Sequence, residues 1–298
     1  MPSLRSRLLR ILVRRFNFFA DRNLSVPEMR RAIDSSTRFQ RLPRGAAVRA
    51  MSAGAVPAER TWSEGAPDDR ALLYFHGGAF LFGSPATHRS LVGRLAIAGG
   101  TPAVSVDYRL APEFPFPAAV EDAVAAYRFL LRSGIAPRKI VAAGDSAGGN
   151  LALVLLLALR EAGEPLPAAA VCLSPVTDFT FSGDSFRTKA AADPIFPKGV
   201  SLPVGLYAGS ADPRHPLLSP LYGDLRGLPP VLFHVGEDEV LLDDSTRAAE
   251  KIRAAGGQAQ VVVWPGMWHV FQALAPLIPE ADRSIRQIGN FIREKQAG

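Results

Sequence analysis

The chain has 298 residues, of which 48% are hydrophobic and 21% are charged. This composition is typical of a globular protein, with enough residues for one large α/β domain or two smaller ones. No window of about twenty residues is free of charge, which excludes a membrane-spanning helix. The single cysteine, Cys172, excludes a disulfide framework, and its apolar neighbours predict a buried structural thiol. We expect a cytoplasmic protein.

The amino-terminal segment "MPSLRSRLLRILVRRFNFF" carries much of the excess positive charge behind the formal net charge of +6. Its apolar residues recur at helical spacing, with Leu4, Leu8, Ile11 and Leu12 on one side. Arginines interrupt every apolar stretch and no small-residue cleavage site follows, so it does not resemble a secretory signal. We expect the apolar side to pack on the rest of the protein. The alternatives are an interfacial helix on anionic lipid and a targeting sequence.

From about residue 70 onward, short apolar strands alternate with longer helical patterns. Alternation of this kind predicts parallel βαβ units and therefore an α/β protein. The strands are nearly continuous in apolar residues, as a sheet covered on both faces requires. A leading pair of strands is predicted at 46–53 and 58–64. The later strands are predicted at 71–75, 101–109, 139–146, 168–178, 229–237 and 259–266, and the helices at 116–134, 149–163, 243–257 and 280–296.

Two segments do not fit the alternation: residues 1–44, and a stretch rich in proline and glycine at about 180–215. Insertions outside the strand ends of an open α/β sheet usually cover a ligand site. We therefore predict an amino-terminal cap region at 1–44 and a catalytic domain at 45–298 that contains a cap insertion at about 180–215. We do not expect nucleic-acid binding, because the basic residues are spread along the chain without a recognised binding motif.

The stretch "GDSAG", residues 144–148, matches the G-x-S-x-G pattern of a nucleophile elbow. A predicted strand precedes it and a long predicted helix follows it, as an elbow needs. Ala147 and Gly148 allow tight packing at the turn, and the helix amino terminus favours negative charge developing near Ser146. The alternative is a serine that only caps the helix. The context favours a nucleophile.

A serine hydroxyl is a weak nucleophile without a base. Of the five histidines, His269 follows the last strand and lies downstream of the serine, so we predict it as the base. His234 lies inside an apolar strand and is predicted to be a core histidine. The acid that orients the base should come from the loop after the strand at 229–237. The residues alone leave it open among Glu237, Asp238 and Glu239, with Asp243 and Asp244 further along.

An oxyanion formed during acyl transfer needs backbone N–H donors held in place. The stretch "FHGGAF" follows a predicted strand, and its glycines let the backbone approach a substrate oxygen without a Cβ in the way. We predict an oxyanion hole made by Gly77, Gly78 and Ala147.

From about residue 70 to residue 275 the chain resembles the hormone-sensitive-lipase-like carboxylesterases of the α/β-hydrolase fold. His76-Gly77-Gly78-Ala79 is similar to the family's oxyanion motif, with alanine where a third glycine is commoner. "DYRLAPEFPFPAAVED" at 107–122 is a near-complete match and more specific than the elbow. "GDSAGGN", "SPVTD" and the Asp-Pro pair at 193–194 also match. The resemblance implies an α/β-hydrolase fold with a helical cap, and structural roles for Arg109, Glu113 and Asp122.

The resemblance also bears on the acid, because family members commonly read D-P-L-x-D-E with the first aspartate catalytic. Laid on this chain without gaps, that column falls on Glu239, and Asp238 is the alternative. The resemblance implies hydrolysis of short- to medium-chain esters by a serine, histidine and acid, without metal or cofactor, and a homodimer through the last strand and helix. The alternatives are a lactone hydrolase, a membrane-surface lipase, and a ligand-binding protein that has lost the chemistry. We expect no stable membrane insertion.

Overall fold

The computed structural model describes residues 2–15, 24–35, 37, 41–196 and 204–298. Its centre is an eight-stranded sheet with the order β1-β2-β4-β3-β5-β6-β7-β8. Strands β3 to β8 run parallel to one another, whereas β2 pairs antiparallel with both β1 and β4. The strands are β1 (Ala46–Ala53), β2 (Val56–Ser63), β3 (Ala71–Phe75), β4 (Ala103–Val106), β5 (Ile140–Asp145), β6 (Ala169–Leu173), β7 (Val231–Gly236) and β8 (Ala259–Trp264).

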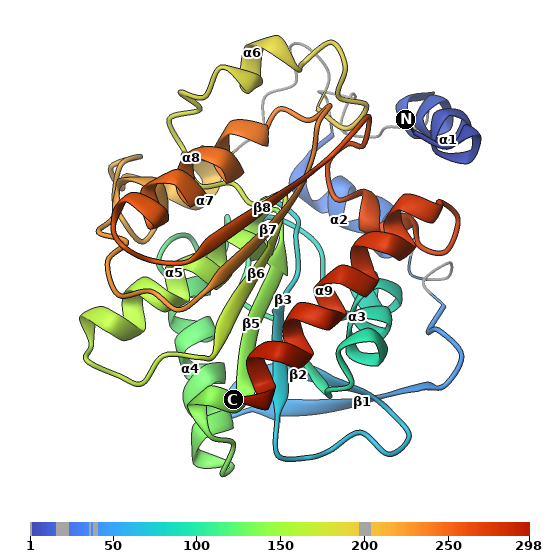
Figure 1. Ribbon diagram of the computed structural model, residues 1–298. Coiled ribbons are helices and arrows are strands. Elements are labelled where there is room, and N and C mark those ends of the chain that lie inside the picture. The colour runs from blue at the N-terminus through green and yellow to red at the C-terminus, as the bar shows by residue number, and fades with distance from the viewer. Residues whose placement is uncertain (1, 16–23, 36, 38–40, 197–203) are drawn as a thin grey trace.

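Helices cover both faces of the sheet (Figure 1). On one face α4 (Ala118–Arg132), α5 (Ala147–Glu161) and α8 (Leu242–Ala254) share a buried cluster with residues of the sheet. On the other face α3 (Pro85–Gly99) and α9 (Pro279–Ala297) form a second cluster. The predicted mostly parallel sheet between two layers is confirmed. Helix α3 is an element that the sequence patterns above did not predict.

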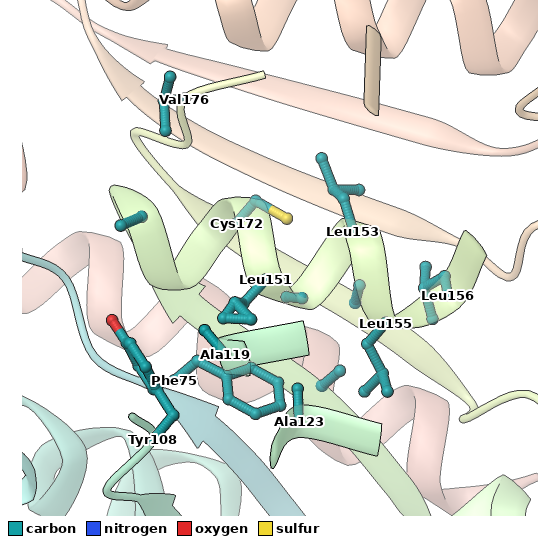
Figure 2. Close-up of a cluster of buried hydrophobic side chains, with 14 of the residues drawn as sticks. Phe75, Tyr108, Ala119, Ala123, Leu151, Leu153, Leu155, Leu156, Cys172 and Val176 are labelled. Atoms are coloured by element: carbon teal, nitrogen blue, oxygen red, sulfur yellow. The ribbon is translucent and has the colours of Figure 1, made fainter. Parts of the chain in front are cut away.

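Helix α5 is deeply buried, since twelve of its fifteen residues are covered and six of these are leucines. Figure 2 shows Leu151 and Leu155 of α5 among side chains of β3 and α4, including Phe75 and Ala123. Each fully buried leucine contributes about 1.5–3 kcal/mol relative to an exposed one. The helix is thus a firm base for the turn that precedes it.

That turn brings the start of α5 against the end of β3. A Cβ atom placed on Gly148 would lie 1.9 Å from the carbonyl oxygen of Phe75, which no real Cβ contact allows. Glycine is therefore required at 148 by the close approach of two backbones, as the tight packing predicted for the elbow implies.

The remaining elements are short or lie beside the sheet. Helix α1 (Leu4–Arg15) and helix α6 (Ser185–Thr188) lie beyond the end of the sheet that is far from the carboxyl terminus (Figure 1). The others are α2 (Val26–Ser35), α7 (Gly205–Ala208), and the short 3-10 turns η3 (Pro137–Lys139), η4 (Pro220–Tyr222) and η5 (Phe271–Leu274). The boundaries of the cap region and of the insertion stay predictions, and residues 197–203 of the insertion lie outside the described residues.

The orientation of α1 corrects one expectation. Leu4, Leu8, Ile11 and Leu12 do not pack on the protein but are 49–77% exposed. The narrower opposite side is buried instead: Ser6 is fully covered, and Leu9 and Val13 pack against the cluster of α3 and α9. Among the described residues, no helix combines the length and the apolar character needed to cross a bilayer.

Candidate active site

Ser146 occupies the turn between β5 and α5 in a strained backbone conformation. Its φ of 54° and ψ of −117° fall outside the backbone regions that residues other than glycine prefer. The conformation is held by neighbours, since the Ser146 N–H donates to the carbonyl of Leu173 at 2.8 Å. The Ser146 side chain makes no capping hydrogen bond to the helix. The turn therefore has the strained strand-to-helix geometry expected of an elbow and does not fit a plain serine cap.

His269 lies in the loop after β8 and faces Glu239 in the loop after β7. Its Nδ1 is 3.5 Å from Oε1 of Glu239, and the carboxylate of Glu239 is fully buried. The other oxygen, Oε2, accepts hydrogen bonds from Ser174 Oγ and from the Gly236 N–H, each at 2.8 Å. Both oxygens of Glu239 are therefore engaged, and one of them is directed at the imidazole.

Ser174 is a residue of this site that the sequence reasoning missed. Besides donating to Glu239, its hydroxyl accepts the N–H of Val270 at 3.2 Å, so it joins the acid loop to the histidine loop. It stands directly after β6 with a φ of 46°. The "SPVTD" match begins at this serine and was the available signal.

The four other acidic candidates have different partners. Asp238 Oδ2 accepts a hydrogen bond from Arg10 at 2.7 Å, and its side chain is 23% exposed. Glu237 accepts the N–H of Gly266. Asp243 and Asp244 accept backbone N–H groups, those of Ser185 and Thr177 respectively. Of these five acids, only Glu239 hydrogen-bonds to His269 in the part of the chain that the structure describes.

The charge on Glu239 favours a protonated His269. Burial on its own lowers the pKa of His269, but the hydrogen bond and charge of Glu239 outweigh this, with smaller help from Asp193 and Asp145. The net effect holds the pKa of His269 above its ordinary value. An imidazole in this state is suited to take a proton from a hydroxyl group and to hold the resulting positive charge beside a carboxylate.

The loop after β3 supplies backbone donors, but not all those predicted. The Gly77 N–H already donates to Asp145 Oδ1 at 3.1 Å. For the N–H groups of Gly78, Ala79 and Ala147, no partner is found among the described residues. Gly78 has a φ of 126°, which a side chain rarely adopts, and Ala79 accepts a φ of 53°. The loop therefore leaves two consecutive N–H groups unpaired, those of Gly78 and Ala79.

Asp145, next to Ser146, anchors this loop. Its Oδ1 accepts the hydroxyl of Tyr74 at 2.6 Å as well as the Gly77 N–H, and its Oδ2 is 3.4 Å from His88 Nε2. Burial alone raises the pKa of Asp145, but the charge of His88 and the hydrogen bonds from His88 and Tyr74 outweigh it. The net pKa of Asp145 is therefore lower than that of an ordinary aspartate, which favours the ionised carboxylate. The Asp145 carboxylate thus connects the turn at Ser146 to the loop after β3 through a hydrogen bond.

Ser146 and His269 line one cavity of about 270 Å³, together with His88 and the loop after β3. Most of its other lining is apolar. Phe196 packs edge-on against the His269 ring with centroids 4.8 Å apart. This volume lies just below the usual range for small-molecule sites, about 300–1,000 Å³. The lining includes Val13 and Ile33 from the first 44 residues, and Phe181, Phe196 and Val204 from the stretch at about 180–215.

Other residues singled out from the sequence have structural settings. His234 is buried in β7, where its Nδ1 meets Ser284 Oγ and the Trp264 Nε1–H, and burial lowers its pKa to about 3. Cys172 is buried in β6, and burial raises the pKa of its thiol. Both are core residues, as predicted. Within the described ranges, no group of three or more His, Cys, Asp or Glu side chains could hold a metal ion.

Three charged residues of the 107–122 stretch, Arg109, Glu113 and Asp122, also form structural contacts. Arg109 donates from its backbone N–H and its guanidinium to Asp122, at 2.8–3.0 Å. Glu113 accepts bidentate hydrogen bonds from the guanidinium of Arg30 in α2. The Nε–H of Arg30 also donates to the carbonyl of Leu81. These pairs hold the loops beneath the cavity in position.

Comparison with known proteins agrees with this geometry. A family model described as the alpha/beta hydrolase fold matches residues 72–273. An acetyl-hydrolase of Streptomyces hygroscopicus is 47% identical over 227 residues, 76% of each protein, and the esterase LipU of Mycobacterium tuberculosis is 41% identical over 260 residues, 85% of each. A solved esterase of the bacterial hormone-sensitive lipase family matches 99% of both chains, with a TM-score of 0.94 and 43% identity. The chain therefore belongs to the α/β-hydrolase family, and within it to the esterases of the bacterial hormone-sensitive lipase family.

Proposed function

We propose that this serine ester hydrolase cleaves small carboxylic esters with Ser146 as nucleophile, His269 as base and Glu239 as the acid. The carrying observation is that a strained serine and a carboxylate-paired histidine open into the same small cavity. The neighbouring loop offers unpaired backbone N–H groups at the same place. Each of these groups has a defined part in acyl transfer.

The reaction begins when Ser146 Oγ attacks the ester carbonyl and its proton passes to His269 Nε2. The imidazolium is stabilised by Glu239, and the tetrahedral oxyanion is bound by backbone N–H groups. His269 then gives its proton to the leaving alcohol, and the carbon–oxygen bond breaks to leave an acyl-serine. Water attacks this acyl group while His269 takes one of its protons. Collapse releases the carboxylic acid and returns the proton to Ser146.

For the oxyanion we propose Gly78, Ala79 and Ala147 as donors, with Ala79 in place of the predicted Gly77. The Gly77 N–H donates its hydrogen bond to the charged Asp145 carboxylate. This single donor is therefore not available to a substrate oxyanion. Ala79 follows Gly78 in the same loop and its N–H is free of a described partner. Gly77 then acts by fixing the loop rather than by binding the oxyanion.

The cavity supports short- to medium-chain acyl groups as substrates. It is small and mostly apolar, and one relative at 47% identity bears the name acetyl-hydrolase. Its lining by Val13, Ile33, Phe181, Phe196 and Val204 supports a cap formed by residues 1–44 and about 180–215. We also place the enzyme in the cytoplasm, since a lone buried thiol suits a reducing compartment.

The test is hydrolysis of a chromogenic short-chain ester by Ser146→Ala and His269→Ala. Each should lose about 10⁴-fold or more in kcat, as triad members do elsewhere. His215→Ala is the matched control, because His215 is an exposed histidine of the insertion and its loss should leave the rate near that of the unmodified enzyme. A Ser146→Ala or His269→Ala enzyme that keeps more than about a tenth of the rate contradicts the assignment. A rate profile over esters of increasing acyl length, with lactones included, defines the substrate range.

A further inference from the structure

Helix α1 presents a continuous apolar stripe to solvent. Leu4, Leu8, Ile11 and Leu12 are 77%, 65%, 65% and 49% exposed. Their spacing of three and four residues places them on one side of the helix. We call these four residues the α1 stripe. Single exposed leucines are ordinary on protein surfaces, but four on one short helix form a patch that marks an interaction site.

The stripe faces outward because the opposite side of α1 is fixed to the protein. Leu9 and Val13 pack against the core, and Ser6 is fully buried. The Arg10 guanidinium donates to Asp238 Oδ2 at 2.7 Å and to the carbonyl of Ala192 at 2.6 Å. Turning the helix over to bury the stripe would break these contacts. The stripe is thus presented by an anchored helix.

Arginines border the stripe on both sides. At 100° per residue, Arg5 lies along one edge and Arg7 and Arg14 along the other, and all three are exposed. Arg14 reaches the neutral carbonyl of Ala191, and no acidic partner of Arg14 is found among the described residues. Helix α1 contains no acidic residue. An apolar stripe edged with arginines matches the surface of an anionic bilayer, where leucines enter the acyl boundary and guanidinium groups meet phosphates.

We propose that the α1 stripe docks this protein on the surface of an anionic phospholipid bilayer, with α1 lying in the plane of the interface. A second copy of the chain is a poorer occupant, because two facing stripes would bring two sets of arginines together without acidic partners. The overall charge of +6 adds to the attraction for anionic lipid. Val13, on the inner side of the same helix, lines the catalytic cavity, so the docked helix holds that cavity beside the lipid.

The experiment measures co-sedimentation of the full chain with vesicles of phosphatidylcholine alone and of phosphatidylcholine mixed with phosphatidylglycerol. Binding should require phosphatidylglycerol and should fall as salt screens the arginines. The triple variant Leu4→Gln/Leu8→Gln/Ile11→Gln should lower the partition coefficient more than about tenfold, because each glutamine removes apolar area from the interface. Glutamine is a good helix former, so α1 itself should persist.

The matched control is Ile97→Gln, which changes an exposed apolar residue of α3 near the far end of α9 and should leave vesicle binding unchanged. Thermal unfolding and hydrolysis of a short water-soluble ester should be the same in the triple variant and the unmodified protein, which establishes that the fold is intact. Vesicle binding is measured without turnover, so its outcome is independent of the catalytic assignment.

Three results would overturn the proposal. The unmodified chain fails to bind the mixed vesicles, the triple variant binds them as well as the unmodified chain, or sedimentation velocity without lipid shows an oligomer that the triple variant dissociates. The last result would make the stripe a contact between copies of the chain. A further variant, Arg5→Gln/Arg7→Gln, should weaken the dependence on phosphatidylglycerol, because it removes charge and leaves the stripe in place.

Discussion

Glu239 is buried with both carboxylate oxygens in use, and this makes its charge effective. Because the Glu239 side chain is fully buried, its carboxylate acts on the imidazole at low dielectric, while Ser174 and the Gly236 N–H hold it in place. Asp238, one residue earlier, is turned outward to Arg10 and is partly exposed to water. Neighbouring acids in one turn therefore do different work.

We predict that Glu239→Gln lowers kcat/KM for a short-chain ester by on the order of 10³–10⁴-fold, because the imidazolium loses its stabilising charge and the histidine its orientation. Asp238→Asn should keep the rate within a few-fold and weaken only the contact with Arg10. Steady-state kinetics on the two purified variants decide this. A severe loss in Asp238→Asn with a mild one in Glu239→Gln would reverse the assignment.

The raised pKa of His269 predicts a pH dependence with a definite sign. The base works only when neutral, so kcat/KM should rise with pH through a midpoint above the ordinary histidine value of 6.5. Removing the carboxylate charge in Glu239→Gln destabilises the protonated ring, so the midpoint of the residual activity should move down. The profile is measured with a neutral ester substrate. An upward movement would show that another group titrates.

At this scale the sequence predicted types of residue better than directions of side chains. The order of serine and histidine along the chain was enough to pick Ser146 and His269, which the structure brings to one cavity. Three consecutive acidic residues cannot be separated by composition, because the turn decides which one points inward. The Gly77 hydrogen bond could not be foreseen either, since its partner lies 68 residues away in the chain.

Among the elements, the junction of β5 and α5 is packed most closely. Its strained serine is tolerated because β3 presses against the start of α5 and the buried leucines hold the helix in place. The elbow and the loop after β3 thus meet where two backbones approach closely.

We predict that Gly148→Ala lowers the free energy of unfolding by about 1–3 kcal/mol, as overpacking of a dense interior does. The added Cβ must displace Phe75 or the start of α5, so the rate of ester hydrolysis should fall as well. Gly205→Ala is the control, because a Cβ there meets nothing within 4 Å and α7 is helical at that point. Urea unfolding curves give the comparison. Equal stability of Gly148→Ala and the unmodified chain would contradict the packing argument.

Helix α3 has sequence signals at both of its ends that predict a helix, although its apolar periodicity does not. Ser84 and Thr87 form a capping box, Pro85 stands in the first turn, and Gly100 closes the helix in a left-handed conformation. Its apolar residues are spread around the helix, because α3 is buried on several sides. Periodicity therefore gave no clear stripe, although the end signals alone would have located the helix.

For the whole molecule, the alternation of strands and helices was sufficient to predict two helical layers around one sheet. It could not predict the orientation of α1, which is apolar on two sides. The side with four large apolar residues was expected to be buried. The side with Leu9 and Val13 is buried instead, because Arg10 donates there to Asp238 and to the carbonyl of Ala192. Charged partners from distant segments decided the orientation.

The expected homodimer through the last strand and helix stays a prediction. Strand β8 is an edge of the sheet, and Val263 on it is 40% exposed, so the edge is open to another strand. We predict that Val263→Lys shifts a dimer toward monomer in sedimentation velocity, whereas Ala50→Lys on β1, at the opposite edge of the sheet, leaves the distribution unchanged. A chain that is monomeric at all concentrations would show that this edge has no such partner.

The anchoring of α1 has a practical consequence for how the enzyme is handled. Arg10 connects the beginning of the chain to the loop of Asp238 and to the backbone of the insertion, whereas the carboxyl terminus emerges at the opposite end of the sheet (Figure 1). An affinity tag or a solid support joined at the amino terminus would load α1, the helix that makes this connection and whose Val13 lines the cavity. Attachment through Gly298 places the support near the starts of β3 and β5, away from the loops that line the cavity, so the carboxyl terminus is the end to choose for immobilising this esterase.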